Sequence, residues 1–416
     1  MSSRLTIEGG IPLSGTVKAS GAKNAALPIL AATILMSGES EILNVPHLKD
    51  IVTIIRMLNA LGVRAEYHSP NRVKIWNNRK IRHIAPYELV TAMRASFFVA
   101  GPLLAKTGYA KVPLPGGCSI GSRPVDIHLK GFKALGATVD IEHGFVEMRC
   151  KSLKGTKIYL DFPSVGATEN IMMAACLAEG ETIIENCARE PEITDLAYCL
   201  IAAGAKIEGI DSSTLIVQGV RDLHGVRHSV ISDRVEAGTL LIAGAITHGN
   251  ITVENVQPDH LAPLLLKLKE CDLKLDVGDT YIRVLSNGHI QPTDVETLPF
   301  PGFPTDMQAQ MMSLLTLANG HSVMKETIFE NRFMHAHELV RMGAKIKLDN
   351  SYALITGVEK LSGAEVKITD LRAGAALILA GLAAEGKTTV YGLKHLERGY
   401  EDLPGKIRSL GGKIFE

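Results

Sequence analysis

Hydrophobic and polar positions follow two periods along the chain, and the same order of segments returns six times. Stretches rich in Ala, Leu, Ile and Met are typical of buried helices, and they lead through short turns into β-branched segments typical of strands. One pair of strands is Lys206-Ile207-Glu208 and Thr214-Leu215-Ile216-Val217, whose alternation suits a half-exposed sheet. Each copy therefore predicts the order strand–helix–strand–helix–strand–strand, which is an α/β arrangement.

Two recurring turns mark the copies. The first follows the first helix of each copy and contains Gly38, Gly108, Gly180, Gly249, Gly320 and Gly386. The second follows the second helix and contains Gly62, Gly136, Gly204, Gly343 and Gly411, whereas the fourth copy has Cys271-Asp272 there. A glycine just after a helix is expected to adopt the left-handed conformation that caps the helix. Both turns return about every 70 residues, which indicates an internal repeat.

The length of 416 residues is too great for one hydrophobic core and predicts two domains. We predict a two-domain α/β protein made of six repeated βαβαββ units, three per domain. The boundary is expected near Val226–Asp233, so that one domain spans residues 22–229. The other spans 1–21 plus 230–416, where the short N-terminal strand completes it.

Charge and cysteine spacing exclude several classes of protein. Lys+Arg and Asp+Glu balance at 44 each, which argues against a general nucleic-acid binder. No apolar leader opens the chain, and the richest apolar run, Ala373–Ala384, is too short to span a bilayer. The six cysteines lack metal-ligand spacing and are expected to be reduced. We therefore expect a cytoplasmic protein with no membrane contact and no metal site; no protein partner is indicated.

Cations recur where the helices are predicted to start. The helix starts carry Lys23-Asn24, Arg94, Arg123, Ser164-Val165-Gly166, Asp233-Arg234, Asp306, Arg332, Asp370-Leu371-Arg372 and Arg398. Acidic residues at such positions have an ordinary role as caps. Cations there face the positive end of the helix dipole and are unfavourable unless an anion binds among them. Lys23, Arg94, Arg123, Arg332, Arg372 and Arg398 therefore predict an anionic ligand.

One long irregular segment has no counterpart in the other copies. It runs from Pro113 to Pro124 and is rich in Gly and Pro, which is typical of a functional loop. Cys118 lies at its middle, close in sequence to Arg123. An accessible thiol near cations has a lowered pKa and is reactive. Cys118 is thus the cysteine predicted to be functional, whereas Cys176, Cys187 and Cys199 fit the core.

Asp306 admits two interpretations. It follows Pro304-Thr305 and precedes a strongly apolar helix, so it suits a helix cap. Alternatively, its carboxylate is directed into the cationic site, where it would abstract a proton. The loops GxxxxGK[ST] and GxGxxG are absent, so nucleotide binding by those motifs is not supported.

Several of these segments together resemble one family over essentially the whole chain. They are Ser20-Gly21-Ala22-Lys23-Asn24-Ala25, Met93-Arg94-Ala95-Ser96, Pro115-Gly116-Gly117-Cys118-Ser119-Ile120-Gly121, Arg123-Pro124-Val125-Asp126, Ser164-Val165-Gly166-Ala167-Thr168, Phe303-Pro304-Thr305-Asp306, Phe329-Glu330-Asn331-Arg332-Phe333-Met334, Asp370-Leu371-Arg372 and Arg398-Gly399-Tyr400. The chain resembles the UDP-N-acetylglucosamine 1-carboxyvinyltransferases, and the Cys118 loop is the most specific part of the match. The resemblance implies an inside-out α/β barrel of two domains that closes over substrate.

The resemblance also implies an activity and residue roles. The enolpyruvyl group of phosphoenolpyruvate would move to the 3′-hydroxyl of UDP-N-acetylglucosamine through a tetrahedral intermediate, releasing phosphate, in the committed step toward peptidoglycan. Lys23, Arg123 and Arg398 would hold the phosphate, and Arg332 and Arg372 would lie around the carboxylate. Cys118 would protonate the methylene carbon and form the adduct with fosfomycin, and Asp306 would take the hydroxyl proton. The residues implied to bind the nucleotide sugar are Asn24, Arg94, Arg123, Pro124, Val125, Asp126, Ile127, Ser164, Val165, Gly166 and Ile328.

Two positions depart from the family pattern, since Phe162 replaces a lysine and Phe98 a tryptophan of some members. Two other functions remain open at this stage. One is enolpyruvyl transfer to shikimate phosphate, which the Cys118 loop disfavours. The other is a non-catalytic protein that binds UDP-sugar, which the intact Lys23 and Asp306 disfavour. An RNA 3′-end cyclase, built from similar repeats, is disfavoured by the absence of basic bias.

Overall fold

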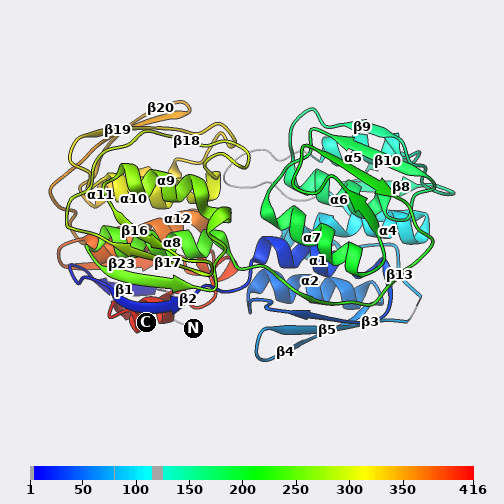
Figure 1. The fold of residues 1–416 in the computed structure, drawn as a ribbon, viewed down its shortest axis with the longest axis horizontal. Helices are drawn as coiled ribbons and strands as arrows, with labels where there is room; N and C mark the ends of the chain where they lie inside the picture. The colour runs from blue at the N-terminus through cyan, green and yellow to red at the C-terminus, as the bar shows by residue number, and fades with distance from the viewer. Residues whose placement is uncertain (1–3, 79, 115–124) are drawn as a thin grey trace. The chain divides into compact units, whose positions relative to one another are not determined.

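The computed structural model describes residues 4–78, 80–114 and 125–416. The chain divides into two compact units, each packed mainly within itself (Figure 1). We call the described residues within 21–114 and 125–231 the central unit, and residues 4–20 with 232–416 the terminal unit. Both are mixed α/β structures. Within the described ranges, every helix is too short or too polar to cross a membrane.

The central unit contains helices and strands in alternation. Its helices are α1 (Lys23–Ala32), α2 (Lys49–Ala60), α3 (Tyr87–Ala92), the 3-10 helix η1 (Arg94–Val99), α4 (Ala100–Thr107), α5 (Asp126–Ala134), α6 (Val165–Ala175) and α7 (Pro191–Ala202). Its strands are β3 (Met36–Leu43), β4 (Arg64–His68), β5 (Arg72–Asn77), β6 (Tyr109–Pro113), β7 (Thr138–Glu142), β8 (Phe145–Arg149), β9 (Lys157–Tyr159), β10 (Glu181–Glu185), β11 (Lys206–Glu208), β12 (Thr214–Gln218), β13 (Leu223–His224) and β14 (Arg227–Ser229).

The terminal unit repeats this alternation. Its helices are α8 (Arg234–Ile246), η2 (Pro258–Leu261), α9 (Ala262–Glu270), η3 (Thr305–Met307), α10 (Gln308–Leu315), α11 (Met334–Arg341), α12 (Leu371–Ala383), η4 (Leu396–Arg398) and α13 (Leu403–Ser409). Its strands are β1 (Arg4–Glu8), β2 (Ser14–Lys18), β15 (Asn250–Glu254), β16 (Lys274–Val277), β17 (Tyr281–Leu285), β18 (Val295–Glu296), β19 (His321–Lys325), β20 (Lys345–Asp349), β21 (Tyr352–Thr356), β22 (Glu365–Lys367), β23 (Lys387–Tyr391) and β24 (Lys413–Phe415).

The sheets share one strand order. In β9-β10-β12-β11 and in β18-β19-β21-β20, the first two strands are parallel and the other pairings are antiparallel. Two sheets of the terminal unit take strands from the start of the chain: β2 pairs in parallel with β15, and β1 lies between β23 and β24. The sheet of β3 takes its parallel strands, β13 and β14, from a segment far along the chain, after α7.

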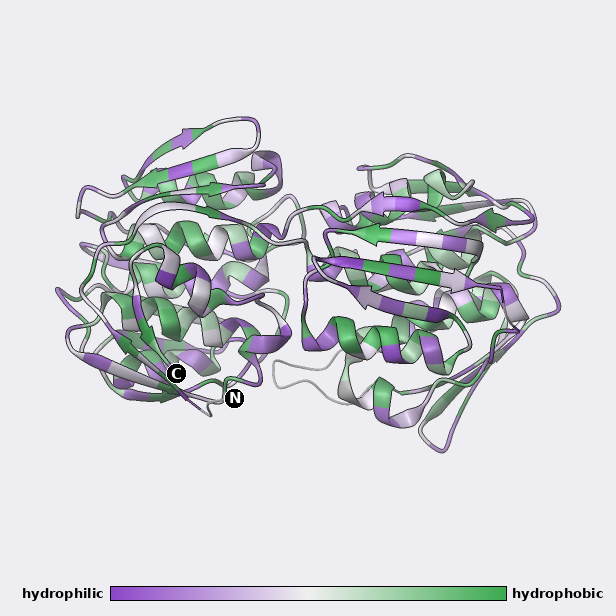
Figure 2. Ribbon diagram, turned by 90° about the horizontal axis from the view of Figure 1, so that it is seen from below, coloured by the Kyte–Doolittle hydropathy of each residue, from purple (hydrophilic) through white to green (hydrophobic). Residues whose placement is uncertain are grey.

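Buried helices form the core of each unit. In the terminal unit α8, α10 and α12 pack against one another, and in the central unit α6 packs against α1, α4, α5 and α7. Helices α8 and α12 are apolar on nearly every side and correspondingly buried, including the expected Ala373–Ala384 run. Figure 2 shows the complementary pattern in the strands, whose colour alternates along their length because one sheet face is solvated.

The recurring turns explain where most helices end. Gly62, Gly136, Gly204, Gly343 and Gly411 all have positive φ, and Asp272 takes the same conformation in the fourth copy with a φ of 63°. The prediction for Gly249 was wrong, because His248 adopts the positive φ there. Gly249 is required for a different reason: a Cβ atom at this position would lie 2.3 Å from the carbonyl oxygen of Leu13.

Asn77 is expected to be important for the stability of the central unit. Its buried side-chain amide donates to the carbonyl groups of Thr33, Ile34 and Met36, just after α1. Replacing Asn77→Ala removes these three hydrogen bonds from buried acceptors and should lower the free energy of unfolding by about 2–3 kcal/mol. The free energy of unfolding can be measured by urea unfolding followed by the fluorescence of Trp76, the single tryptophan. The exposed neighbour provides the control, since Asn78→Ala should change stability by less than about 0.5 kcal/mol.

Candidate active site

A carboxylate held by two buried arginines forms the most distinctive site of the terminal unit. Oδ1 of Asp306 accepts a hydrogen bond from Nη2 of Arg332 at 2.8 Å, and Oδ2 accepts one from Nη2 of Arg372 at 2.9 Å. The two arginine side chains are each only 3% exposed, whereas that of Asp306 is 28% exposed. Sequence positions 306, 332 and 372 are therefore brought into direct contact, as the anion-site prediction requires.

Local structure places each member of this cluster. Asp306 lies in η3, which continues directly into α10, and the N-cap residues are Pro304 for η3 and Met307 for α10. The interpretation of Asp306 as a helix cap was therefore wrong. Asp370, by contrast, is the N-cap residue of α12. Its Oδ1 accepts hydrogen bonds from the backbone N–H groups of Arg372 and Ala373, and Arg372 therefore lies in the first turn of the helix.

Arg372 retains unused hydrogen-bonding capacity. Its buried Nε and Nη1 atoms form no hydrogen bond with any of the described residues. Burial disfavours the charge, but Asp306 together with Tyr400 and Asp233 outweighs this effect and raises the pKa of Arg372. A buried, charged guanidinium with two unused donors is suited to bind a second anion.

His335 lies beneath the same cluster. It is fully buried on α11, and its Nδ1–H donates to the carbonyl oxygen of Arg332 at 3.1 Å. Burial lowers the pKa of His335 to about 4, with a further contribution from the charge of Arg332 that the carboxylate of Asp370 opposes. The histidine is thus neutral in the folded protein at pH 7.

This pKa predicts a stability change in mild acid. Below pH 6.5 the unfolded chain takes up a proton at His335, whereas the folded chain does so only near pH 4, so stability falls as the pH drops through this range. His335→Gln removes this contribution. Between pH 8 and pH 5 the variant should lose about 2 kcal/mol less stability than the wild type. Urea unfolding at both pH values measures the difference; equal losses would contradict the buried neutral histidine.

The cation predicted at the first helix start also meets a carboxylate. Lys23 is the first residue of α1, and its Nζ lies 3.1 Å from Oδ2 of Asp50 near the start of α2, with both side chains buried. In the described residues, Lys23 and the arginine pair are thus bound to carboxylates of the protein itself, Asp50 and Asp306, and the anionic ligand stays a prediction. Asn24 follows Lys23 in α1 and is exposed.

Two further predicted segments lie side by side in the central unit, at the starts of α5 and α6. Ser164 caps α6, its Oγ accepting from the N–H of Ala167 at 3.4 Å, and Val165 and Gly166 form the first turn. His128 of α5 lies against Gly166, where a Cβ atom would be 3.3 Å from the imidazole ring. Val125, Asp126 and Ile127, which begin α5, are thereby placed next to Ser164–Gly166.

Of the remaining predicted residues, the structure describes some and not others. Ile328 follows β19, and its N–H donates to Oε1 of the buried Glu326 at 2.8 Å. Arg398 ends η4, which packs against α12, the helix of Arg372. Cys118, Arg123 and Pro124 lie outside the described residues, and of Arg94 only the backbone, at the start of η1, is described.

The described cysteines agree with the sequence prediction. Cys176, Cys187, Cys199 and Cys271 are buried and Cys150 is half-buried, all with free thiols. Burial raises the pKa of the Cys176 thiol to about 12 and also raises that of Cys150, so these thiols are unreactive at pH 7. In the described ranges no group of three or more potential metal ligands occurs.

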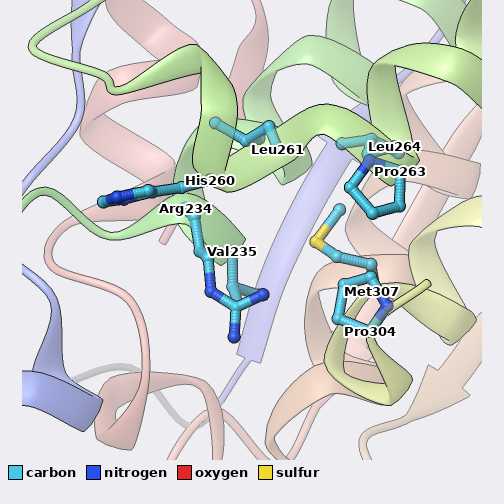
Figure 3. A pocket seen from close by; sticks show the side chains of 8 residues that line it. All are labelled: Arg234, Val235, His260, Leu261, Pro263, Leu264, Pro304 and Met307. Atoms are coloured by element: carbon cyan, nitrogen blue, oxygen red, sulfur yellow. The ribbon is translucent and has the colours of Figure 1, made fainter. Parts of the chain in front are cut away.

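Two hollows in the terminal unit are lined by residues other than Arg332 and Arg372. Figure 3 shows a narrow one of about 10 Å³, lined among others by Arg234, His260 and Met307, with room for at most one water molecule. A larger groove of about 660 Å³ runs beside α9 and β19. Neither hollow is lined by a predicted site residue.

Sequence reasoning missed the residues that surround the predicted ones. Asp50, the carboxylate partner of Lys23, was not among the predicted site residues. Thr239, Gln310 and Tyr400, which form a hydrogen-bonded group near Asp306 and Arg372, were not singled out. Only Tyr400 carried a sequence clue, because it belongs to the segment Arg398-Gly399-Tyr400.

Comparisons with known proteins agree with this architecture. Residues 7–407 match the family described as EPSP synthase (3-phosphoshikimate 1-carboxyvinyltransferase). The enolpyruvyl transferase NikO from Streptomyces tendae superposes with a TM-score of 0.90 at 26% identity, covering 99% of this chain and 98% of that one. An EPSP synthase from Acinetobacter baumannii has the same fold: it superposes with a TM-score of 0.78 at 17% identity, covering 100% of this chain and 99% of that one. Fold and site together define an enolpyruvyl transferase.

Sequence relatives narrow the class. UDP-N-acetylglucosamine 1-carboxyvinyltransferase 1 of Caldanaerobacter subterraneus subsp. tengcongensis is 53% identical over 415 residues, covering 100% of both chains. The protein of the same name from Staphylococcus aureus is 54% identical over 414 residues, covering 99% of this chain and 98% of its own. The chain thus belongs to the UDP-N-acetylglucosamine 1-carboxyvinyltransferases within the EPSP synthase family.

Proposed function

We propose that this protein transfers the enolpyruvyl group of phosphoenolpyruvate to the 3′-hydroxyl of UDP-N-acetylglucosamine and releases phosphate, the first committed step of peptidoglycan synthesis. The observation that carries the proposal is the 53–55% identity, over the whole chain, to relatives named for this reaction. Both substrates are anionic metabolites of the cytoplasm, where we propose the enzyme acts. The reaction proposed needs no metal or organic cofactor.

The terminal unit would supply groups for the reacting centre. Phosphoenolpyruvate carries a phosphate and a carboxylate, so its binding needs several cations in fixed geometry. The unused Nε and Nη1 donors of Arg372, with the adjacent Arg332, suit the carboxylate. Lys23, Arg123 and Arg398 would hold the phosphate. Asp306 would remove the proton of the sugar hydroxyl, whose oxygen then attacks C2 of phosphoenolpyruvate.

Cys118 would complete the addition by giving its thiol proton to the methylene carbon, which forms a tetrahedral ketal. Loss of a proton from the new methyl group and departure of phosphate then restore the double bond in the product. The same thiol would form the covalent adduct with fosfomycin. The loop that carries it would also exclude water, since the cationic character at C2 invites hydrolysis.

The central unit would bind the nucleotide sugar through Asn24, Arg94, Arg123–Ile127 and Ser164–Gly166, and Ile328 of the terminal unit would join them. The first turns of α5 and α6 lie side by side, which supports a shared role in binding one ligand. Backbone N–H groups at helix starts favour anions such as a diphosphate. The exposed Phe162, two residues before Ser164, stands beside this surface.

We also propose the finer architecture implied by the family: an inside-out α/β barrel with six βαβαββ units, three in each domain, and domains of residues 22–229 and 1–21 plus 230–416. The shared strand order of the sheets supports it. Buried helices inside each unit, with strands that have one solvated face, support it as well.

The test is phosphate release with both substrates. Phosphate should appear only when phosphoenolpyruvate and UDP-N-acetylglucosamine are present together, and the product should contain both skeletons. Shikimate 3-phosphate serves as the competing acceptor, and its use would favour the alternative transferase. Binding of the nucleotide sugar without turnover would instead indicate a non-catalytic protein.

A further inference from the structure

Three polar side chains are buried together behind Asp306 and Arg372. Thr239 of α8, Gln310 of α10 and Tyr400, which follows η4, are almost completely excluded from solvent. Nε2 of Gln310 lies 3.0 Å from Oη of Tyr400 and 3.2 Å from Oγ1 of Thr239, and Oη and Oγ1 are 3.1 Å apart. Together they form a closed triangle of hydrogen-bonding atoms within the helix core of the terminal unit.

The direction of each hydrogen bond follows from the protons available. The Thr239 hydroxyl donates its one proton to the carbonyl oxygen of Val235 at 2.7 Å, so Oγ1 can only accept within the triangle. The Tyr400 hydroxyl therefore donates to Thr239. The amide of Gln310 donates one proton into the triangle and the other to the backbone carbonyl oxygen of Asp306 at 2.9 Å.

This group contacts the backbone of Asp306 and the side chain of Arg372. The side-chain amide of Gln310 binds the backbone carbonyl oxygen of Asp306. The ring of Tyr400 lies against Arg372, whose Cζ is 5.3 Å from the ring centroid, in a cation–π contact. Because one guanidinium nitrogen is bound to Asp306 and the ring contacts the guanidinium group, the position of Arg372 is fixed, while its buried Nε and Nη1 form no hydrogen bond with the described residues.

Stability alone does not account for burying these polar groups. Replacing both partners of a buried hydrogen bond by apolar groups of the same shape is close to neutral. Buried polar networks do, however, fix a single side-chain arrangement. Oε1 of Gln310 has no donor among the described residues, so the group carries a stability cost.

We propose that Tyr400, Thr239 and Gln310 are positioning residues that hold Arg372 for the carboxylate of phosphoenolpyruvate and hold the segment of Asp306 beside it. The inference rests on the proposed function and extends it to residues that do not themselves touch substrate. Since the group acts through Arg372, its loss affects phosphoenolpyruvate and spares the nucleotide sugar.

Tyr400→Phe tests the inference because it removes the hydroxyl and keeps the ring. The KM for phosphoenolpyruvate should rise about tenfold, the change expected when one buried hydrogen bond is lost, while the KM for UDP-N-acetylglucosamine changes less than about twofold. Thr239→Val removes the acceptor of the same hydrogen bond and should show the same selectivity. The double variant should lose little more than Tyr400→Phe alone, because both changes break one interaction.

Tyr281→Phe is the matched control: its hydroxyl bonds Asp276 on the surface of the same unit, and the variant should match the wild type. Unchanged kinetics in Tyr400→Phe, or an equal rise in both KM values, would overturn the positioning role and leave the proposed function intact. Absence of turnover in the wild-type protein assayed alongside would overturn the proposed function, and the positioning role with it.

Discussion

Asp306→Asn is expected to lower kcat by about 10²–10⁴-fold, the range found when a general base is removed. An amide keeps the shape of the carboxylate and one acceptor oxygen, but it cannot take the proton of the sugar hydroxyl. It also no longer neutralises Arg332 and Arg372, which lie 2.8 and 2.9 Å away. The KM for phosphoenolpyruvate should therefore stay constant or fall, because both guanidinium groups become more available to its carboxylate.

Steady-state kinetics with each substrate varied in turn measure this split between kcat and KM. Asp349→Asn, an exposed aspartate of β20 in the same unit, is the control and should leave both constants unchanged. Circular dichroism establishes that the Asp306 variant is folded. A kcat within about threefold of the wild type would exclude Asp306 as the general base, since even a modest general base contributes about 10²-fold.

Cys118→Ser is expected to reduce turnover by about 10²-fold or more and to abolish covalent labelling by fosfomycin. A serine hydroxyl is a much weaker acid than a thiol, whose pKa is about 8.5 before any neighbouring cation lowers it. It is therefore a poor proton donor to carbon and a poor nucleophile. Cys118 lies outside the described residues, so this prediction rests on the sequence of the loop.

Intact-protein and peptide mass spectrometry after fosfomycin treatment locate the adduct. Cys150→Ser provides the control, because Cys150 is the half-buried cysteine and burial raises the pKa of its thiol. This variant should keep both activity and labelling. An adduct that persists in Cys118→Ser would assign the reactive thiol to another cysteine and contradict the role of the loop.

The local features of this protein could be read from its sequence. The turn glycines, the buried helix at Ala373–Ala384 and the core cysteines depend on side-chain chemistry over a few residues, so periodicity and residue type are enough. The anion-site hypothesis was also available, because cations at helix starts need a compensating charge. His248 shows the limit even at short range, since either of two adjacent residues can take the left-handed conformation.

Only the tertiary structure determined which segments meet. Residues 306, 332 and 372 approach one another because η3, α11 and α12 pack in one unit, and no sequence pattern records that packing. Likewise, β13 and β14, which follow α7, complete the sheet of β3 near the start of the chain. The sequence by itself determined the helices, the strands and the presence of cationic and acidic groups at helix starts, because these features depend on neighbouring residues. The carboxylate partners of the cations, and the buried group around Tyr400, depend on contacts between distant segments, which only the folded chain creates.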